Sequence, residues 1–149
     1  MEIKWVDTHC HLQLLNKNLD ENHFKNIEFL VIPGVDVESS SKAKEISSSL
    51  EVESYWSAGL HPHDAKLLDT QRHDLEKLFV EADLIGETGL DFYRNLSTKE
   101  EQRENFLFHL EFSKQLNKPI IIHCRDSFQD TYDSVSYTHL RAHETDRHL

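Results

Sequence analysis

Two histidines, His9 and His11, follow a short apolar run near the N-terminus of the sequence. Residues two apart on an extended segment point to the same side, so both imidazole rings can converge on one point. Two imidazoles in this arrangement suit a first-row divalent metal ion. The pair therefore predicts a metal site, and the alternative is two surface histidines that share this spacing by chance.

Two further candidate ligands follow apolar runs later in the chain. Glu87 comes after the short run 84–85, and His123 follows three isoleucines. A carboxylate has two oxygens, so it can bridge two cations held about 3.5–4 Å apart. Taken singly, Glu87 can be a helix cap or a loop acid, and His123 a hydrogen-bonded histidine that binds no metal. Because the four residues follow three different predicted strands, we expect one metal site formed by His9, His11, Glu87 and His123.

Three polar residues beside these positions are candidates for contacts with a substrate. Arg125 can hold a phosphate through its planar guanidinium, or it can pair with Asp126 or Asp91 and fix a loop. Asp91 can orient a metal ligand from behind or simply close a turn. His61 can line the pocket, whereas His63 is expected to be exposed.

The elements that must position these residues alternate along the chain. Apolar runs predict strands at 3–6, 29–32, 55–58, 84–85 and 120–122. Helical spacing predicts helices at about 19–25, 36–50, 75–82 and 98–116, with another starting soon after residue 126. Asp36 is available to cap the second helix, and Thr98 forms a capping box with Glu101. The histidines at positions 23, 73 and 109 fall within these helices and are expected to be surface or packing residues.

Strands that alternate with helices and consist of continuous apolar runs indicate a parallel sheet covered on both faces. The polar clusters lie at the C-terminal ends of these strands. Open α/β sheets and (β/α)₈ barrels both place their sites at this edge. Neither a G-x-G-x-x-G nor a Walker pattern follows any predicted strand, which disfavours a nucleotide-binding sheet.

The bulk composition limits the class of protein. A length of 149 residues with 38% hydrophobic and 29% charged residues is typical of one globular domain. No apolar run has the roughly 18 residues needed to cross a bilayer, and no signal-type segment opens the chain, so we expect a cytoplasmic protein. Cys10 and Cys124 are too few for a disulfide framework and are expected to be free thiols.

The formal net charge of −11 argues against a protein that wraps nucleic acid with a broad basic surface. It does not exclude a nuclease. Metal ions bound in a site can supply the positive charge that meets a phosphodiester, and they dominate the local field.

The alternation of strands and helices is expected to end near Ser134. The segment VSYTHLRAHET, at 135–145, can be read as the translation of a transposon-type sequencing adapter. We therefore expect two parts, a partial enzyme domain at 1–133 and a non-native, adapter-derived tail at 134–149. The alternative is a genuine C-terminal helix in which His139 and His143, four residues apart, can ligate a metal.

Four sequence blocks together resemble the TatD family of metal-dependent deoxyribonucleases. They are DTHCHL at 7–12, GLHP at 59–62, IGETGLDFYR at 85–94 and PIIIHCRD at 119–126, and their order and spacing agree with the family. The helix entry E-x-Q-R-x-x-F at 100–106 agrees as well. The resemblance implies an α/β fold, the N-terminal portion of a TIM-type (β/α)₈ barrel with about five of its eight β/α units.

The same resemblance implies roles for the candidate residues. His9 and His11 would bind a first metal, His123 a second, and Glu87 would bridge both as the catalytic carboxylate. The cofactors would be two divalent cations, zinc, manganese or magnesium. The family's remaining ligands, a histidine and an aspartate, come from later strands. Glu144-Thr145-Asp146 imitates a later family motif but stands too close to His123 to be assigned.

The implied activity is hydrolysis of ester bonds, most specifically of phosphodiesters in DNA, with a small phosphoester as the other possible substrate. An amidohydrolase-type enzyme that cleaves amides, esters or lactones is the nearest alternative, and a non-catalytic zinc-binding protein is another. No membrane partner is expected, and the parent enzyme is expected to be a monomer. With five of eight strands, the 149-residue chain is expected to be poorly folded and inactive.

Overall fold

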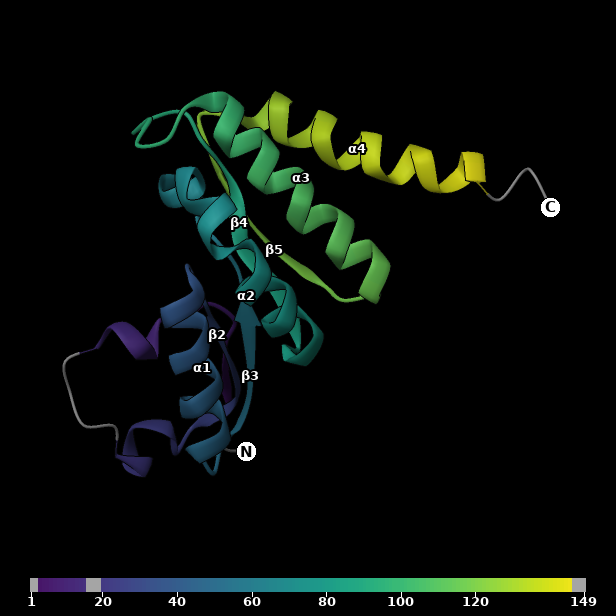
Figure 1. Cartoon of the computed structure of the whole chain (residues 1–149). Helices are drawn as coiled ribbons and strands as arrows, with labels where there is room; N and C mark the ends of the chain where they lie inside the picture. Colours follow the sequence, from purple (N-terminus) through teal and green to yellow (C-terminus); the bar gives the residue numbers. More distant parts are fainter. Residues whose placement is uncertain (1–2, 16–19, 146–149) are drawn as a thin grey trace.

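The computed structural model describes residues 3–15 and 20–145, with side chains described up to residue 138. Its centre is a five-stranded sheet in the order β1-β2-β3-β4-β5 (Figure 1). The strands are β1 (Trp5–Asp7), β2 (Ile27–Pro33), β3 (Glu53–Ala58), β4 (Leu84–Asp91) and β5 (Ile120–Arg125). All four neighbouring pairs are parallel, as the sequence predicts.

Helices connect the strands of this sheet. They are α1 (Val37–Ser49), α2 (Leu68–Glu81), α3 (Lys99–Leu116) and α4 (Phe128–Thr145). The described residues also form three short 3₁₀ helices, which are η1 (Leu12–Leu14), η2 (Glu21–Phe24) and η3 (Pro62–Leu67). Because the strands follow one another in space in chain order, the fold is that of the first five units of a TIM-type barrel, which confirms the predicted fold class.

The hydrophobic core lies between the sheet and the helices along one of its faces (Figure 1). Ile32 and Ile85 from the strands are fully buried against Leu75 and Phe79 of α2. Leu75 and Phe79 belong to the apolar face that the helical spacing predicts. The sheet is less covered at its edges, where Trp5 on β1 is 64% exposed and Ile122 on β5 is 37% exposed.

The helix ends follow the predicted capping residues. The Asp36 side chain accepts the backbone N–H of Ser39 at the start of α1, and Thr98 and Glu101 form a capping box at the start of α3. The C-terminus of α2 is capped from outside the helix by Lys118. Its Nζ donates to the carbonyl oxygens of Phe79 and Val80 at 2.7 Å each and of Ala82 at 2.5 Å. A cation at this position also interacts favourably with the helix dipole.

The two strands that carry Glu87 and His123 are longer than predicted. Because β4 extends to Asp91 and β5 to Arg125, Glu87 and His123 lie within strands rather than after them. The register of β4 against β5 shifts between Ile85 and Thr88, and regular pairing then continues to Asp91 and Arg125. In place of the helix predicted at 19–25, the structure has only the 3₁₀ turn η2. Residue 19, where the predicted helix starts, lies outside the described residues.

Helix α4 continues past Ser134, where the sequence suggests that regular structure ends, and reaches Thr145. Val135 packs against a small cluster of Leu90, Phe106 and Leu110. The side chains of His139 and His143 lie outside the described side chains, so a ligand role for this pair stays a prediction. Along the described segments, no helix combines the length and the apolar character that a membrane span requires.

Candidate metal centre

Four chain segments bring histidines and one carboxylate to a single point at the C-terminal ends of the strands. His9 and His11 follow β1, and His61 follows β3 as the N-cap of η3. Glu87 lies on β4 and His123 on the neighbouring β5. These positions agree with the sequence prediction, because parallel strands end at a common edge.

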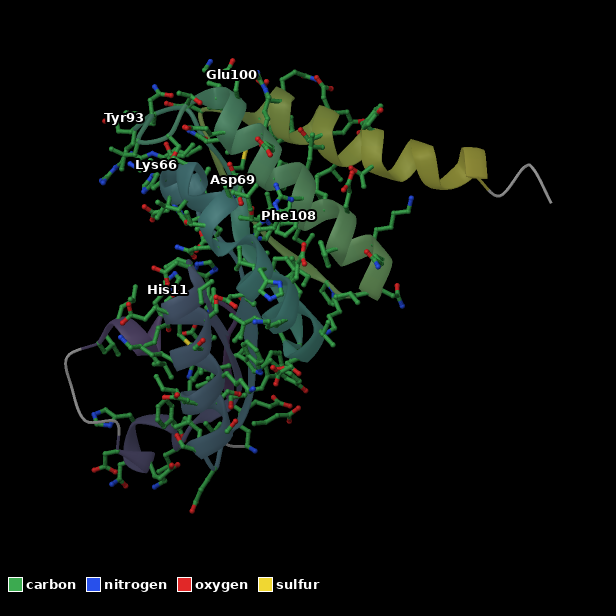
Figure 2. All side chains as sticks on the ribbon, in the orientation of Figure 1. His11, Lys66, Asp69, Tyr93, Glu100 and Phe108 are labelled. Carbon is green, nitrogen blue, oxygen red and sulfur yellow. The ribbon has the colours of Figure 1, made fainter. Side chains whose placement is uncertain are left out.

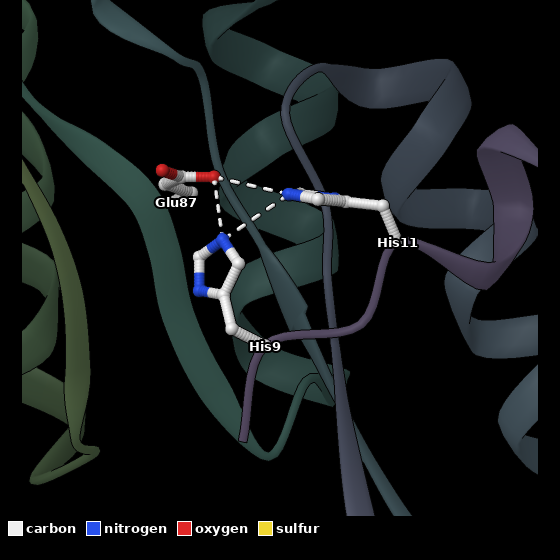
Figure 3. Close-up of side chains that lie close together, drawn as sticks. All are labelled: His9, His11 and Glu87. Atoms are coloured by element: carbon white, nitrogen blue, oxygen red, sulfur yellow. Dashed lines mark hydrogen bonds and ion pairs between the residues drawn. The ribbon is translucent and has the colours of Figure 1, made fainter. Parts of the chain in front are cut away.

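The first group joins Glu87 to the histidine pair that follows β1 (Figure 3). The Oε2 atom of Glu87 lies 3.2 Å from Nε2 of His9 and 3.4 Å from Nε2 of His11. The two Nε2 atoms are themselves 3.2 Å apart. Three donor atoms therefore face one common point.

The second group uses the other oxygen of the same carboxylate. The Oε1 atom of Glu87 lies 3.3 Å from Nδ1 of His123 and 3.9 Å from Nε2 of His61. These two ring nitrogens are 3.3 Å apart. His61, which the sequence places only in the pocket lining, thus supplies a second nitrogen beside His123.

The donor atoms fit divalent cations. Within each group all donor atoms lie within 4.8 Å of one another. Two imidazole nitrogens that face each other at hydrogen-bond distance cannot both carry a proton, so each pair presents at least one free lone pair. Imidazole with carboxylate suits zinc, manganese and related ions. Glu87, at 7% exposure, is shared by both groups.

Hydrogen bonds behind the rings fix their orientation. Nδ1 of His11 lies 3.0 Å from the carbonyl oxygen of Pro33, which can only accept a hydrogen bond. Nδ1 of His11 must therefore carry a proton, and its Nε2 is the nitrogen that faces Glu87. Such support of a ligand by a backbone carbonyl is common in metal sites.

Asp91 closes the turn after β4 and also contacts two histidines of the candidate site. Its Oδ1 accepts the backbone N–H groups of Tyr93 at 3.1 Å and Arg94 at 3.0 Å and so closes the turn after β4. Its Oδ2 lies 2.8 Å from Nε2 of His63 and 3.0 Å from Nε2 of His123. The prediction that His63 is exposed is wrong, because η3 turns its ring inward onto this fully buried carboxylate.

The charges of the site are set by burial and by these contacts. Burial alone would raise the pKa of Glu87, but hydrogen bonds from His11 and His123 outweigh it and hold this pKa well below its usual range. Burial, together with the charge of His123, lowers the pKa of His61 to about 4. At neutral pH Glu87 is therefore a carboxylate and His61 a neutral ring, the forms that bind metal.

Two glycines of the GETG segment allow Glu87 to reach this position. Gly86 has φ +112° and Gly89 has φ +139°, conformations that side chains rarely adopt. A Cβ at Gly89 would collide with the carbonyl oxygen of His123, and one at Gly86 would lie 2.5 Å from the carbonyl oxygen of Ile121. The absence of side chains at both glycines lets β4 and β5 approach closely on both sides of the carboxylate.

Arg125 lies at the rim of the site. It is exposed, and its guanidinium carbon lies 4.0 Å from the centre of the Tyr93 ring. Among the described residues it forms no ion pair with Asp126 or Asp91, which the sequence offers as an alternative. Its contact with a substrate phosphate stays a prediction.

A cavity of about 390 Å³ opens over the candidate metal ligands, and its lining includes His11, His61, Glu87 and His123. A larger cavity of about 580 Å³ lies between α3 and α4 and is lined by Leu107, Lys114 and Tyr137 among others. Of these two cavities, the smaller one holds the converging donor atoms of the described residues.

The cysteines are free thiols, as predicted, and neither belongs to the donor groups. Cys10 donates through Sγ to the carbonyl oxygen of Val31 at 3.1 Å. Burial and the nearby charge of Asp7 raise the pKa of Cys10 to about 11, so it remains protonated at neutral pH.

For His109 the sequence predicts only a surface or packing role. His109 of α3 is fully buried, its Nδ1 lies 2.7 Å from the carbonyl oxygen of Asn105, and its Nε2 accepts the N–H of Leu60 at 3.0 Å. It thereby ties α3 to the segment that carries His61. A histidine four residues beyond an asparagine on a helix face is no specific signal for such a bond.

The sequence also matches a known protein family. The model of the family described as TatD related DNase matches residues 6–149. The chain belongs to this family. The recognition made from the four sequence blocks is thereby confirmed.

Two proteins of Escherichia coli K12 are among those with similar sequences. An uncharacterized metal-dependent hydrolase, YcfH of Escherichia coli K12, is 31% identical over 138 residues, which cover 85% of this chain and 51% of the relative. The 3′-5′ ssDNA/RNA exonuclease TatD of the same strain is 36% identical over 104 residues, 67% of this chain and 39% of the relative. The chain thus spans about half the length, or less, of these TatD relatives.

Solved structures of TatD proteins share the fold. YJJV, a TatD homolog from Escherichia coli K12, superimposes with a TM-score of 0.81 at 20% identity, covering 93% of this chain and 57% of that one. A TatD family hydrolase from Entamoeba histolytica gives a TM-score of 0.74 at 17% identity, covering 94% and 56%. At these identities the likeness establishes the fold alone.

Proposed function

We propose that this chain carries part of the active site of a hydrolase that uses two divalent cations to cleave phosphodiester bonds in single-stranded nucleic acid. The observation that supports it is that the two oxygens of Glu87 face two different histidine pairs. A single carboxylate between two pairs of imidazole nitrogens is the arrangement that a bridging ligand needs.

Each side chain then has a distinct task. His9 and His11 would hold one cation, and His123 with His61 would hold the other. Asp91 would keep the His123 ring in place from behind. Bound cations supply positive charge for a phosphodiester and lower the pKa of water.

The type of bond follows from the donor set and from the family. In the amidohydrolase alternative, a carbamylated lysine is the bridging group that would favour amide or lactone substrates. In this chain the bridging position holds Glu87, and no lysine belongs to the donor groups of the described residues. TatD of Escherichia coli is named as an exonuclease of single-stranded DNA and RNA. These observations favour a phosphodiester.

A purely structural zinc site is also less consistent with the geometry. Structural sites are usually closed, four-coordinate and rich in cysteine. Here the donor atoms line an open cavity, and Cys10 and Cys124 stand outside the donor groups. An open position beside the donors is what a catalytic site requires.

The test is a metal titration of the purified chain by calorimetry, with Mn²⁺ and with Zn²⁺. We expect two equivalents for the unchanged chain and loss of at least one for Glu87→Ala, because both groups share this carboxylate. Glu45→Ala, which changes a glutamate of α1 that lies outside both donor groups, is the control and should still bind two. Binding by Glu87→Ala that equals the control would contradict the proposal, as would metal-independent release of nucleotides from a single-stranded oligonucleotide.

A further inference from the structure

The loop that follows β4 carries an exposed aromatic ring two residues beyond Asp91. Tyr93 is 61% exposed, and Figure 2 shows it on the same side of the molecule as Lys66 and His11. The guanidinium of Arg125 lies over this ring at 4.0 Å. Because the ring is still largely exposed, its other face is available for a further planar group.

Basic side chains gather around this loop although the protein is strongly acidic, with a net charge of −11. Arg94 is exposed next to Tyr93, and Nζ of Lys99 lies 4.2 Å from the centre of the Phe92 ring. Within the described residues, no carboxylate forms an ion pair with Arg94, Lys99 or Arg125. We call Phe92, Tyr93, Arg94, Lys99 and Arg125 the aromatic–basic patch.

The patch is fixed to the metal centre by one carboxylate. Asp91 accepts the backbone N–H groups of Tyr93 and Arg94 with Oδ1, while its Oδ2 contacts His63 and His123. The far end of the loop is held by Ser97, whose Oγ donates to the carbonyl oxygen of His63 at 2.9 Å. A loop held at both ends loses little conformational entropy when it binds a ligand.

We propose that the aromatic–basic patch binds single-stranded nucleic acid, with one nucleobase stacked on Tyr93 and flanking phosphates held by Arg94 and Arg125. Exposed aromatic rings interleaved with cations are the means by which proteins bind single strands without reading their sequence. In a duplex the faces of the bases are covered by their neighbours, so the patch favours an unpaired strand. The inference rests on the proposed function and names the way its substrate is held.

The test measures binding of the full chain to a fluorescent single-stranded oligonucleotide in EDTA, by anisotropy. Tyr93→Ala should weaken binding about tenfold, since stacking of one base is lost. Tyr93→Phe keeps the ring and should bind like the unchanged chain. An oligonucleotide of equal length with abasic sites should not distinguish Tyr93→Ala from the unchanged chain, because it has no base to stack.

Salt dependence separates the arginines from the ring. Arg125→Gln should reduce the slope of log Kd against log salt by about 0.7, the value for one phosphate contact to a single strand. Tyr93→Ala should leave that slope unchanged. The control is Arg72→Gln on α2, outside the aromatic–basic patch, whose guanidinium also lies over an aromatic ring, 4.7 Å from the centre of Phe108, and pairs with Glu104. This control should bind with the slope of the unchanged chain.

The inference is overturned if the unchanged chain does not bind the oligonucleotide, or if Tyr93→Ala binds as tightly as Tyr93→Phe. It is also overturned if Arg72→Gln changes the slope as much as Arg125→Gln. Metal titration reports on the centre itself and is independent of these results. If the chain binds two metal equivalents but Tyr93→Ala does not weaken oligonucleotide binding, only the patch is refuted. If the variants bind the oligonucleotide as expected but the chain takes up no metal, only the two-metal centre is refuted.

Discussion

The Oδ2 atom of Asp91 lies 3.0 Å from Nε2 of His123, while Nδ1 of the same ring faces Glu87. Both ring nitrogens of His123 therefore face a carboxylate, which can only accept a hydrogen bond. If Nδ1 gives its lone pair to a cation, Asp91 can keep the proton on Nε2 and hold the ring in its orientation.

Asp91→Asn should weaken metal binding at the second group. The substitution would keep an oxygen for the turn but lose the negative charge that holds the His123 ring. We expect a loss of affinity of about 10- to 100-fold for one equivalent, the usual effect of removing such a supporting partner. Calorimetric titration measures it, with Asp74→Asn on the exposed face of α2 as the control. Equal affinities in both variants would rule out the supporting role.

Gly89→Ala should destabilise the fold. The residue has φ +139° and its new methyl group would meet the backbone of His123. Backbone strain of this kind costs about 1–3 kcal/mol, and the collision adds to it. Urea denaturation gives the free energy of unfolding. Asn117→Gly is the comparison, because Asn117 also has positive φ, 51°, and glycine should relieve rather than create strain there. A stable Gly89→Ala variant would show that β4 and β5 can separate without cost.

Stability should fall in mild acid through His109. Burial lowers its pKa to about 4, against 6.5 for an exposed histidine. As the pH falls below 6.5 the unfolded chain binds this proton first, so the free energy of unfolding decreases until about pH 4, by roughly 3 kcal/mol at most. His109→Gln, which does not titrate, should flatten the curve in this interval, while His73→Gln on α2 should not. Parallel curves for all three proteins would exclude this contribution.

Lys118→Met should weaken the end of α2. The substitution removes the three hydrogen bonds that Nζ donates to the carbonyl oxygens of Phe79, Val80 and Ala82. We expect a loss of about 1–3 kcal/mol in the free energy of unfolding, because hydrogen bonds from a charged donor contribute more than neutral ones. Lys114→Met, an exposed lysine of α3, should change it little. Thermal or urea denaturation compares the two, and equal stabilities would contradict the capping role.

The origin of residues 134–149 can be tested on the DNA. The adapter interpretation predicts that a coding sequence amplified from the same source departs from this one after about Asp133. The family match extends to residue 149 and α4 to Thr145. A genomic sequence that retains Val135 through Leu149 would show the segment to be native and the adapter interpretation to be wrong.

Much of the architecture could be predicted from the sequence because it depends on local patterns. The parallel strand order follows from the alternation of elements, and Asp36 and Thr98 mark helix starts by their capping chemistry. The meeting of the ligands follows because parallel strands end at one edge. Inward placement of His63 could not be predicted, since it depends on the path of η3 and on a partner, Asp91, that lies 28 residues away.

The detailed arrangement at Glu87 also could not be predicted from the sequence. A pattern of residues gives the positions of possible ligands but not which oxygen faces which ring. That division depends on the irregular register of β4, which Gly86 and Gly89 permit. His61 joined the second group for the same kind of reason, because a bond between α3 and the N–H of Leu60 fixes the backbone just before it.

The sharing of Glu87 has a mechanical consequence. Covalent bonds fix the distance between its two oxygens. The carboxylate therefore sets a constant spacing between the two points that the histidine pairs face. Any displacement of β4 carries both oxygens together and changes the two coordination spheres at once. Binding of one cation would fix the carboxylate that the other cation also needs, so the two should not bind independently, and a titration should depart from two identical independent sites.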